Sequence, residues 1–492
     1  MFERPRPARV ALLQPFWDFF EDAAPGDLRA DREAMLAEVA DRLGPQVCAQ
    51  ETFESREAAA AAGRRIAAER PHALVVVMGM AVPPAFALAA LEALPSLPLV
   101  VLVLSRRSSY GASYSHADIT VEGGTVGGAQ LTSSLHRHAR PHAVVAVALD
   151  DDRDRDRLAR AVLAATAAGR LREARIGRVG RPIDGYDCVE CDPAALREAT
   201  GIELLDIEPA AIQEAFLAAG ESEAEAVGRE TLASFEPVPG LADGPGFERT
   251  VRMAAALQTL DRDLGLDAGA MNCHVPEIRF APDPGPGLAP CFALGRETSA
   301  GIPWTCAGDV PTAVAMLTAK LLGGAALYHE IEGLDRATGE ALLANSGEHD
   351  LAFADPAAAP ALVRNCWWEG DPCPGLCARF GPPPGPGTLI GFTPHPQARG
   401  GFRFVVAEGT FTARRLPDTG TPHGAFRFAG EDDVVTAWTR WARTGVNHHS
   451  AATPGHLGAA VAAVAGHLGV ECVRVSAAGP LSDYPNTPPC GW

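Results

Sequence analysis

The stretch HALVVVMGM, residues 72–80, decides the fold class of this chain. It is a near-continuous apolar run of strand length, and LPLVVLVLS (97–105) and HAVVAVALD (142–150) repeat the pattern. Such runs indicate strands that are buried on both faces, as in a parallel sheet. Helical segments lie between them, for example DREAMLAEVADRLG (31–44), which ends on Gly44. The first part of the chain is therefore predicted to be a doubly wound α/β domain.

A second series of strands and helices follows, and the texture of the sequence then changes. TGIELLDIEPAAIQEAFLAAG (200–220) reads as a strand that runs into a helix, and LDAGAMNCH (266–274) reads as a later strand. Between 388 and 428, short strands follow one another with no helix between them. We therefore predict an α/β protein with two successive Rossmann-like doubly wound domains and a mostly antiparallel β C-terminal domain. The predicted domain bounds are 1–174, 175–325 and 326–492.

The composition indicates a globular protein that does not bind nucleic acid. The chain has 492 residues, of which 47% are hydrophobic, and its formal net charge is −19 at pH 7. Nucleic-acid and membrane partners are not expected, because phosphate binding needs a basic face. No apolar run reaches the ~18 residues of a membrane span, and the first residues do not have the pattern of a secretory signal. A cytoplasmic location is therefore expected.

Several cofactor chemistries are disfavoured by the sequence. Lys320 is the only lysine and lies in an apolar helical run, so mechanisms that need a lysine nucleophile are not expected. GGTVGGAQ (123–130) lacks the spacing of a dinucleotide-binding loop. Two cysteine pairs, CVEC (188–191) and CPGLC (373–377), have the spacing of half a zinc site, but we interpret them as ordinary reduced thiols.

Acidic residues and histidines that could bind a metal gather in three C-terminal segments. Residues 304–333 run from helix to strand and are expected to deliver Glu330 at a strand end. LLANSGEHDLAF contributes His349, and GVNHHSAATPGHLG contributes the adjacent pair His448 and His449. Oxygen and imidazole ligands from separate loops suit Mn²⁺, Mg²⁺ or Co²⁺ better than a thiolate-bound metal. Each residue also has an ordinary interpretation, as a solvated carboxylate or as a histidine that caps a helix.

These segments resemble a known family of sugar isomerases. CAGDVPTAVAMLTAKLLGGAALYHEI, the NSGEH turn and NHHSAATPGHLGAAVAAVAGHLGV are similar, in that order, to three signatures of the L-fucose/L-arabinose isomerase family. RIGRVGRPIDGYDCVECDPAALREATGIELLDIEP resembles the start of the second domain of that family. The resemblance implies a bound Mn²⁺ (or Mg²⁺ or Co²⁺) and a sugar or polyol substrate. It also implies a homo-oligomer, a trimer or a hexamer, in which a neighbouring subunit helps to close the site.

Carried over residue by residue, the resemblance implies a set of site residues. Glu330 matches a metal-binding carboxylate of the family, and His449 matches its C-terminal histidine ligand, with His448 as the close alternative. His349 matches a further histidine at the metal. The positions expected to contact the substrate are Gln14, Asn447 and His448.

One departure from the family pattern bears on the reaction. The family reads Cys-Glu-x-Asp, with a Glu that binds the metal and transfers protons, whereas this chain reads CAGD at residues 306–309. Ala307 can do neither. Isomerisation through an ene-diol needs a base that removes a proton beside the carbonyl and an acid that returns it. The expected stand-ins are Asp309, Glu332 and Glu348, and Asp309 or Glu330 is the expected catalytic base.

Three functions are consistent with these residues. The first is a divalent-metal-dependent aldose–ketose isomerase that acts on a small sugar or polyhydroxylated substrate through an enediolate, whose charge the metal stabilises. The second keeps the fold but performs another metal-assisted reaction, such as an epimerase, carbon–carbon lyase or biosynthetic step, because Ala307 replaces the expected Glu. The third is a non-catalytic binding homologue. The retained Glu330, His349 and His449 argue against the third, because a scaffold does not need converging polar groups.

Overall fold

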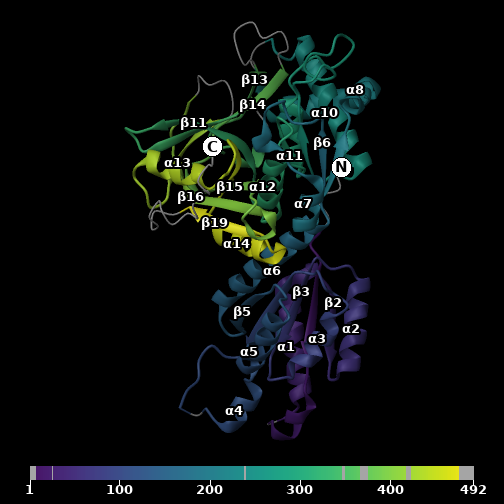
Figure 1. Cartoon of the computed structure of the whole chain (residues 1–492), viewed down its shortest axis with the longest axis vertical. Coiled ribbons are helices and arrows are strands. Elements are labelled where there is room, and N and C mark those ends of the chain that lie inside the picture. Colours follow the sequence, from purple (N-terminus) through teal and green to yellow (C-terminus); the bar gives the residue numbers. More distant parts are fainter. Residues whose placement is uncertain are drawn as a thin grey trace, which may run out of the picture. The chain divides into compact units, whose positions relative to one another are not determined.

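The structure of the chain, a computed structural model, contains two compact units. The residues that it describes are 7–24, 26–112, 114–237, 240–345, 350–365, 375–416 and 423–475. The N-terminal unit comprises Arg6–Arg172 with Ala463–Gly469. Within the described residues, the C-terminal unit comprises Glu173–Ala462 together with 470–475. Figure 1 labels many of the helices and strands of both units and colours the chain along its sequence.

A five-stranded parallel sheet forms the centre of the N-terminal unit. Its strands are β1 (Val10–Pro15), β2 (Val47–Phe53), β3 (Ala73–Met78), β4 (Leu99–Ser105) and β5 (Ala143–Ala148). They pair in the order β2-β1-β3-β4-β5, and every neighbouring pair is parallel. All residues of β1 and β3 are buried, as the apolar run at 72–80 predicted.

Helices cover both faces of this sheet. They are α1 (Leu28–Leu43), α2 (Arg56–Ala68), α3 (Pro84–Leu91), α4 (His116–Val121), α5 (Gly124–Arg137) and α6 (Asp152–Arg172). Ala11 and Leu13 pack in one apolar cluster with α2, α3 and α5, whereas Val10 and Leu12 pack in another with α1 and α6. Successive residues of a strand point to opposite faces, so this division confirms a doubly wound arrangement. Helix α1 begins before the predicted residue 31 because the side chain of Asp27 caps it.

A second parallel sheet lies in the first part of the C-terminal unit. Its strands are β6 (Arg175–Val179), β7 (Glu203–Ile207), β9 (Ala268–Met271) and β10 (Trp304–Thr305), in the order β10-β9-β6-β7. The helices of this region are α7 (Pro193–Thr200), α8 (Pro209–Ala218), α9 (Glu221–Ser234), α10 (Pro245–Leu264), α11 (Cys291–Ala300) and α12 (Val310–Leu321). The segments after β6 and β10 leave the carboxyl edge of the sheet, where doubly wound folds bind ligands.

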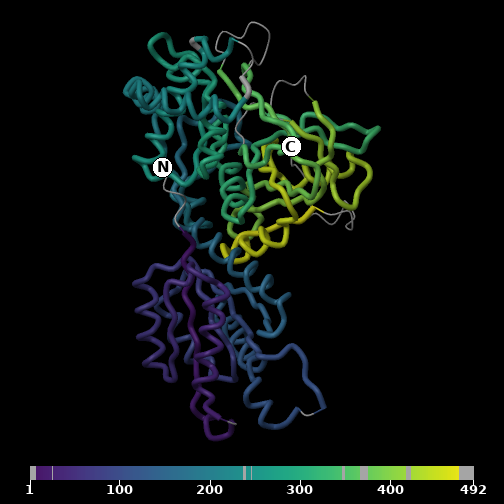
Figure 2. The backbone as a smooth tube through the Cα atoms, turned by 180° about the vertical axis from the view of Figure 1, so that it is seen from behind, coloured from purple at the N-terminus to yellow at the C-terminus, as the bar shows by residue number. Residues whose placement is uncertain are grey.

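A third, mostly antiparallel sheet follows. Its strands are β11 (Leu327–Asp335), β12 (Glu340–Ala344), β15 (Gly385–Pro394), β16 (Phe402–Phe411), β17 (His423–Phe428), β18 (His449–Pro454) and β19 (Glu471–Val475). They pair in the order β15-β18-β11-β12-β17-β16-β19, and a further β15–β16 pairing closes six of them into a ring. Figure 2 shows these green and yellow strands lying together although they come from separate parts of the sequence.

Shorter elements complete the C-terminal unit. Strands β8 (Glu236–Pro237), β13 (Ala361–Asn365) and β14 (Gly375–Arg379) form a small sheet that joins a strand from before residue 325 to two from after it. The remaining helices are α13 (Val434–Arg443) and α14 (Gly458–Leu468). Short 3-10 turns lie at Asp18–Ala23, Gly44–Gln46, Asp187–Val189 (η3), Leu351–Phe353 and Arg399–Gly401.

The predicted fold class is confirmed: parallel sheets flanked by helices precede a mostly antiparallel sheet. The division at 174 and 325 stays a prediction. Among the described helices, none combines the length and the apolar character that crossing a membrane requires.

Candidate metal centre

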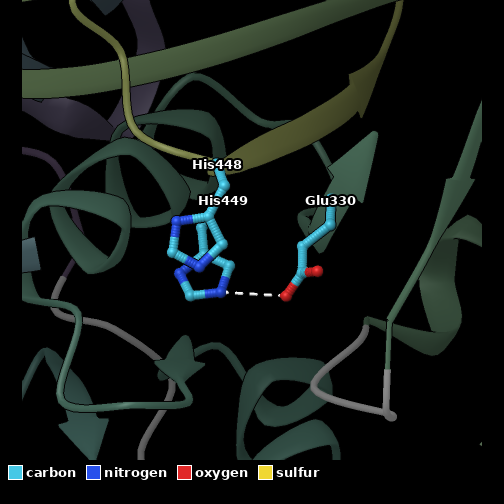
Figure 3. Close-up of side chains that lie close together, drawn as sticks. All are labelled: Glu330, His448 and His449. Carbon is cyan, nitrogen blue, oxygen red and sulfur yellow. Dashed lines mark hydrogen bonds and ion pairs between the residues drawn. The ribbon is translucent and has the colours of Figure 1, made fainter. Parts of the chain in front are cut away.

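Glu330 and His449 face each other across two antiparallel strands. Glu330 of β11 is the register partner of His449, the first residue of β18. Residues that are directly opposite in this way have side chains within contact distance, and Oε1 of Glu330 lies 3.0 Å from Nε2 of His449. Glu330 was expected at a strand end, but it lies inside β11, which extends to Asp335. Figure 3 shows the two side chains converging, with the contact dashed.

Asp309 holds the other nitrogen of His449. Its Oδ2 lies 2.9 Å from Nδ1 of His449. Asp309 is also the N-cap of α12, where it accepts hydrogen bonds from the backbone N–H and the hydroxyl of Thr312, at 2.9 and 2.7 Å. Asn447 donates from Nδ2 to Asp309 at 3.3 Å and accepts from the backbone N–H of His449 at 2.5 Å. Asp309 is wholly buried, so it is placed to orient His449.

The two carboxylates control the charge of His449. Burial lowers the pKa of His449, but hydrogen bonds to Asp309 and Glu330 and their charges outweigh that effect and raise the pKa to about 9. Burial raises the pKa of Glu330, but the hydrogen bond from His449 and its charge lower the pKa below its usual value. The pKa of Glu332 is raised by burial and by the neighbouring carboxylate of Glu330.

His448 completes a cluster of three ligand atoms. Its ring lies 3.8 Å from the ring of His449, centroid to centroid. One donor atom from each of Glu330, His448 and His449 lies within 4.8 Å of the others, which is the only group of three or more His, Cys, Asp or Glu with this spacing among the described residues. Figure 3 shows all three side chains gathered at one point. His449 is buried, whereas His448 is exposed.

The chemistry of this donor set suits a divalent cation. One carboxylate oxygen and two imidazole nitrogens are ligands for Mn²⁺, Co²⁺, Fe²⁺ or Zn²⁺, and Mg²⁺ prefers oxygen alone. Histidine ligands commonly donate the other ring N–H to a carboxylate, which orients the ring. Asp309 stands in that relation to His449. Glu330, His448 and His449 therefore fit a cation, with Asp309 behind them.

The other predicted site residues have different outcomes. Asn447 lies beside the cluster, where it bonds to Asp309 and His449. Gln14 belongs to the N-terminal unit, where its buried side chain donates to the carbonyl of Arg32 at 3.0 Å. His349 lies outside the described residues, as does Glu348. The substrate roles of Gln14, Asn447 and His448 stay predictions.

The CAGD segment at 306–309 forms a tight turn that carries Asp309. Ala307 has a φ of 55°, in the left-handed region, and is only 5% exposed. Gly308 has a φ of 73°, and a Cβ there would lie 3.1 Å from the backbone of Pro182. Glycine is therefore favoured at 308, because its φ is left-handed and a side chain would press on the segment after β6. Beyond β10, the turn offers a methyl group where the resemblance implied a carboxylate.

Two contacts of His448 were missed in the sequence. Sγ of Cys188 lies 3.8 Å from Nδ1 of His448, and the Tyr186 ring meets the His448 ring edge-on at 5.7 Å. The CVEC spacing pointed to Cys188 as one of a pair, but Cys191 is buried while Cys188 is exposed. No sequence signal links 188 to 448. Cys373 of the other pair lies outside the described residues.

Comparison with known proteins places this α/β protein near sugar isomerases. No family profile matches the chain. The chain is 25% identical to the sulfoquinovose isomerase of Priestia aryabhattai over 299 residues, which are 60% of this chain and 64% of that protein. The sulfoquinovose isomerase of Priestia megaterium (strain ATCC 12872 / QMB1551) gives the same values. The chain thus spans less than two thirds of the length of these curated relatives, and the similarity is that of a distant homologue of a sugar isomerase.

Proposed function

We propose that this chain is a divalent-metal-dependent aldose–ketose isomerase that acts on a small sugar. The observation that carries the proposal is the convergence of Glu330, His448 and His449 within 4.8 Å of one another. The distant similarity to sulfoquinovose isomerases adds support, because it arises independently of that geometry. We propose Mn²⁺ as the cation and a homo-oligomer, a trimer or a hexamer, as the assembly.

The residues of the site would divide the work of an ene-diol reaction. A cation held by Glu330, His448 and His449 would polarise the sugar oxygens and stabilise developing negative charge. Asp309 would orient His449, because its oxygens accept hydrogen bonds from Thr312, Asn447 and His449.

Proton transfer needs a carboxyl group that can reach the substrate. Glu332 is the strongest candidate for the proton transfer that Ala307 cannot perform. It lies at a register shift between Ile331 and Gly333, where β11 has one residue more than its partner strand. Such bulges re-aim side chains and are common next to active sites. The side chain of Glu332 hydrogen-bonds to Glu330 and is exposed, so solvent and substrate can reach it.

The relatives suggest a substrate class. Their name says that they isomerise sulfoquinovose, so we propose a hexose or hexose derivative as the first substrate to test. L-arabinose, L-fucose and D-arabinose are the comparison substrates, because the motifs resemble enzymes of that kind.

One observation favours a second function: Ala307 places a methyl group in the turn before Asp309. A metal centre that lacks this carboxylate could catalyse a different enolate reaction, such as an epimerisation or a carbon–carbon cleavage. These reactions would leave the aldose–ketose ratio unchanged or would shorten the carbon chain.

The decisive experiment follows sugar conversion by NMR in D₂O. The metal-free protein is incubated with each sugar, with and without Mn²⁺, and both ketose formation and deuterium incorporation beside the carbonyl are measured. Metal-dependent conversion that disappears in Glu330→Gln, but persists in the surface control Glu248→Gln, is the expected result. Exchange of deuterium without ketose would favour an epimerase. Absence of both from a protein that binds Mn²⁺ would refute the isomerase.

A further inference from the structure

The donor cluster is closed on the side of His449 and open on the side of His448. Behind His449 lie Asp309 and Asn447, and the buried ring of Tyr328 packs on its imidazole with 4.6 Å between centroids. None of these groups can move away without exposing buried polar atoms. His448 is exposed, so its position depends on whatever holds it from the solvent side.

The segment that follows β6 supplies that support. The turn η3 (Asp187–Val189) is fixed to the protein by Val189, which is fully buried. Tyr186, on one side of the turn, places the edge of its ring against His448. Cys188, inside the turn, places Sγ 3.8 Å from Nδ1 of His448, within the range of a sulfur hydrogen bond.

Each of the two histidines therefore has a partner at Nδ1. Nδ1 of His449 faces Asp309, and Nδ1 of His448 faces Cys188. A partner that accepts a hydrogen bond at Nδ1 selects the tautomer with its proton on that nitrogen and leaves Nε2 free to bind a cation. A cysteine sulfur can be such an acceptor. Nε2 of His449 already points at Glu330.

We propose that Cys188 is a positioning residue for His448, and that it makes His448 the third cation ligand. The role rests on the metal centre of the proposed function. The imidazole of His448 would then supply a third ligand where Ala307 supplies no carboxylate. The edge-on contact of Tyr186 adds a second support to the same ring.

Metal affinity tests this role without any measurement of turnover. Mn²⁺ binding is measured by isothermal titration calorimetry on the full chain and on Cys188→Ser and Cys188→Ala. Loss of a partner behind a metal-binding histidine weakens affinity by about 10- to 100-fold, and we expect Cys188→Ala to lie at the lower end. Serine can accept the same hydrogen bond, so Cys188→Ser should retain affinity within about threefold. Cys48→Ala is the matched control, because Cys48 is a partly buried cysteine in the N-terminal unit.

A spectroscopic measurement separates positioning from a general loss of structure. ¹⁵N NMR of histidine-labelled protein should report the Nδ1–H tautomer of His448 in the wild type and in Cys188→Ser, and a mixture of tautomers in Cys188→Ala. The urea midpoint of each variant verifies that it is folded. Equal Mn²⁺ affinity and an unchanged tautomer in a folded Cys188→Ala protein would overturn the proposal.

The outcome is independent of the isomerase reaction. A chain that shows the expected dependence on Cys188 but converts no sugar would refute the proposed function and keep the role of Cys188. If the chain isomerises sugars while Cys188→Ala binds Mn²⁺ as well as wild type, the proposed function is kept and the role of Cys188 is refuted.

Discussion

Asp309 Oδ2 lies 2.9 Å from Nδ1 of His449 and joins the start of helix α12 to the start of strand β18. The carboxylate therefore has two functions in one place, since it caps α12 and orients a candidate metal ligand 140 residues away in the sequence. Its substitution can be designed to separate these two functions.

Asp309→Asn should weaken Mn²⁺ binding by about 10- to 100-fold, as is typical when the partner behind a metal-binding histidine is lost. Asparagine caps helices about as well as aspartate, so the free energy of unfolding contributed by the cap should be kept. Asp309→Ala loses both functions and should also lose about 1 kcal/mol of stability. Titration calorimetry and urea unfolding measure the two effects. An Asp309→Asn protein with wild-type affinity would show that His449 needs no such partner.

The stability of the metal-free protein should depend on pH through His449. The pKa of about 9 in the folded protein lies above the ordinary histidine value of 6.5. The charged imidazole therefore contributes fully below pH 6.5, and its contribution is lost as pH rises through 9. This shift in pKa corresponds to a contribution on the order of 3 kcal/mol to the free energy of unfolding.

Urea unfolding at pH 6, 7.5 and 9 measures this dependence, and His449→Asn serves as the reference. The difference in free energy of unfolding between the two proteins should shrink toward pH 9. A difference that stays constant over this range would contradict a charged His449. Because a cation must displace the proton, Mn²⁺ affinity should rise about tenfold per pH unit between pH 6.5 and 9.

The cluster predicts which substitutions remove the metal. The double variant Glu330→Ala/His449→Ala should contain no Mn²⁺ after dialysis, whereas wild type should contain one ion per chain. Glu332→Gln is the matched control, because its carboxylate neighbours Glu330 without belonging to the group of converging ligand atoms. Elemental analysis gives the result. Equal metal content in the double variant and wild type would show that the cation binds elsewhere.

Ala307 predicts poor activity on ordinary sugars. An acid or base contributes ~10²–10⁴-fold to a rate, so turnover of L-arabinose, L-fucose and D-arabinose with Mn²⁺ should stay below ~1 s⁻¹, the low end of typical enzymes. Ala307→Glu should damage the native reaction, because it introduces a charge at a position that is 5% exposed. Ala307→Gly, which fits the φ of 55°, is the control for the backbone. With turnover below that limit, Glu332, the proposed stand-in, would replace the missing carboxylate only in part, and turnover above that limit would mean that it replaces it fully.

The resemblance also predicts assembly. The chain should form a trimer or a hexamer at micromolar concentration, with Gln14 or Trp17 near the metal of a neighbouring subunit. Multi-angle light scattering gives the mass directly. Gln14→Ala should then lower activity and leave Mn²⁺ affinity unchanged. A stable monomer would contradict the prediction.

The fold class could be predicted because its signal is local. The apolar runs that became β3 and β4 need only burial on both faces to be recognised. Strand β2 escaped notice because it is at the edge of its sheet and only half-buried, so its sequence VCAQETF carries polar residues. The residue bounds differ where a side chain decides them, as with Asp27 before α1.

The candidate site was only partly predictable. Glu330 and His449 were found through the motifs, and their contact depends on a strand register that no local pattern fixes. The motif names Asp309 or Glu330 as the base, and that role stays a prediction; only the structure reveals that the oxygens of Asp309 accept hydrogen bonds from Thr312, Asn447 and His449. Cys188 was interpreted with its neighbour Cys191, because a spacing of three is visible in a sequence and a contact across 260 residues is not.

The position of Glu330 inside a strand affects how the protein would release its cation. Most loop ligands can swing away through local opening, but Glu330 is paired to Ala344 on one side and to His449 on the other, within the closed ring of strands. To displace its backbone, two ladders of amide hydrogen bonds must open together. Amides in such central strands exchange with solvent only in the rarest openings. An ion held there would therefore leave by rotation of side chains on the exposed side of the cluster, at His448, and not by local opening of the backbone.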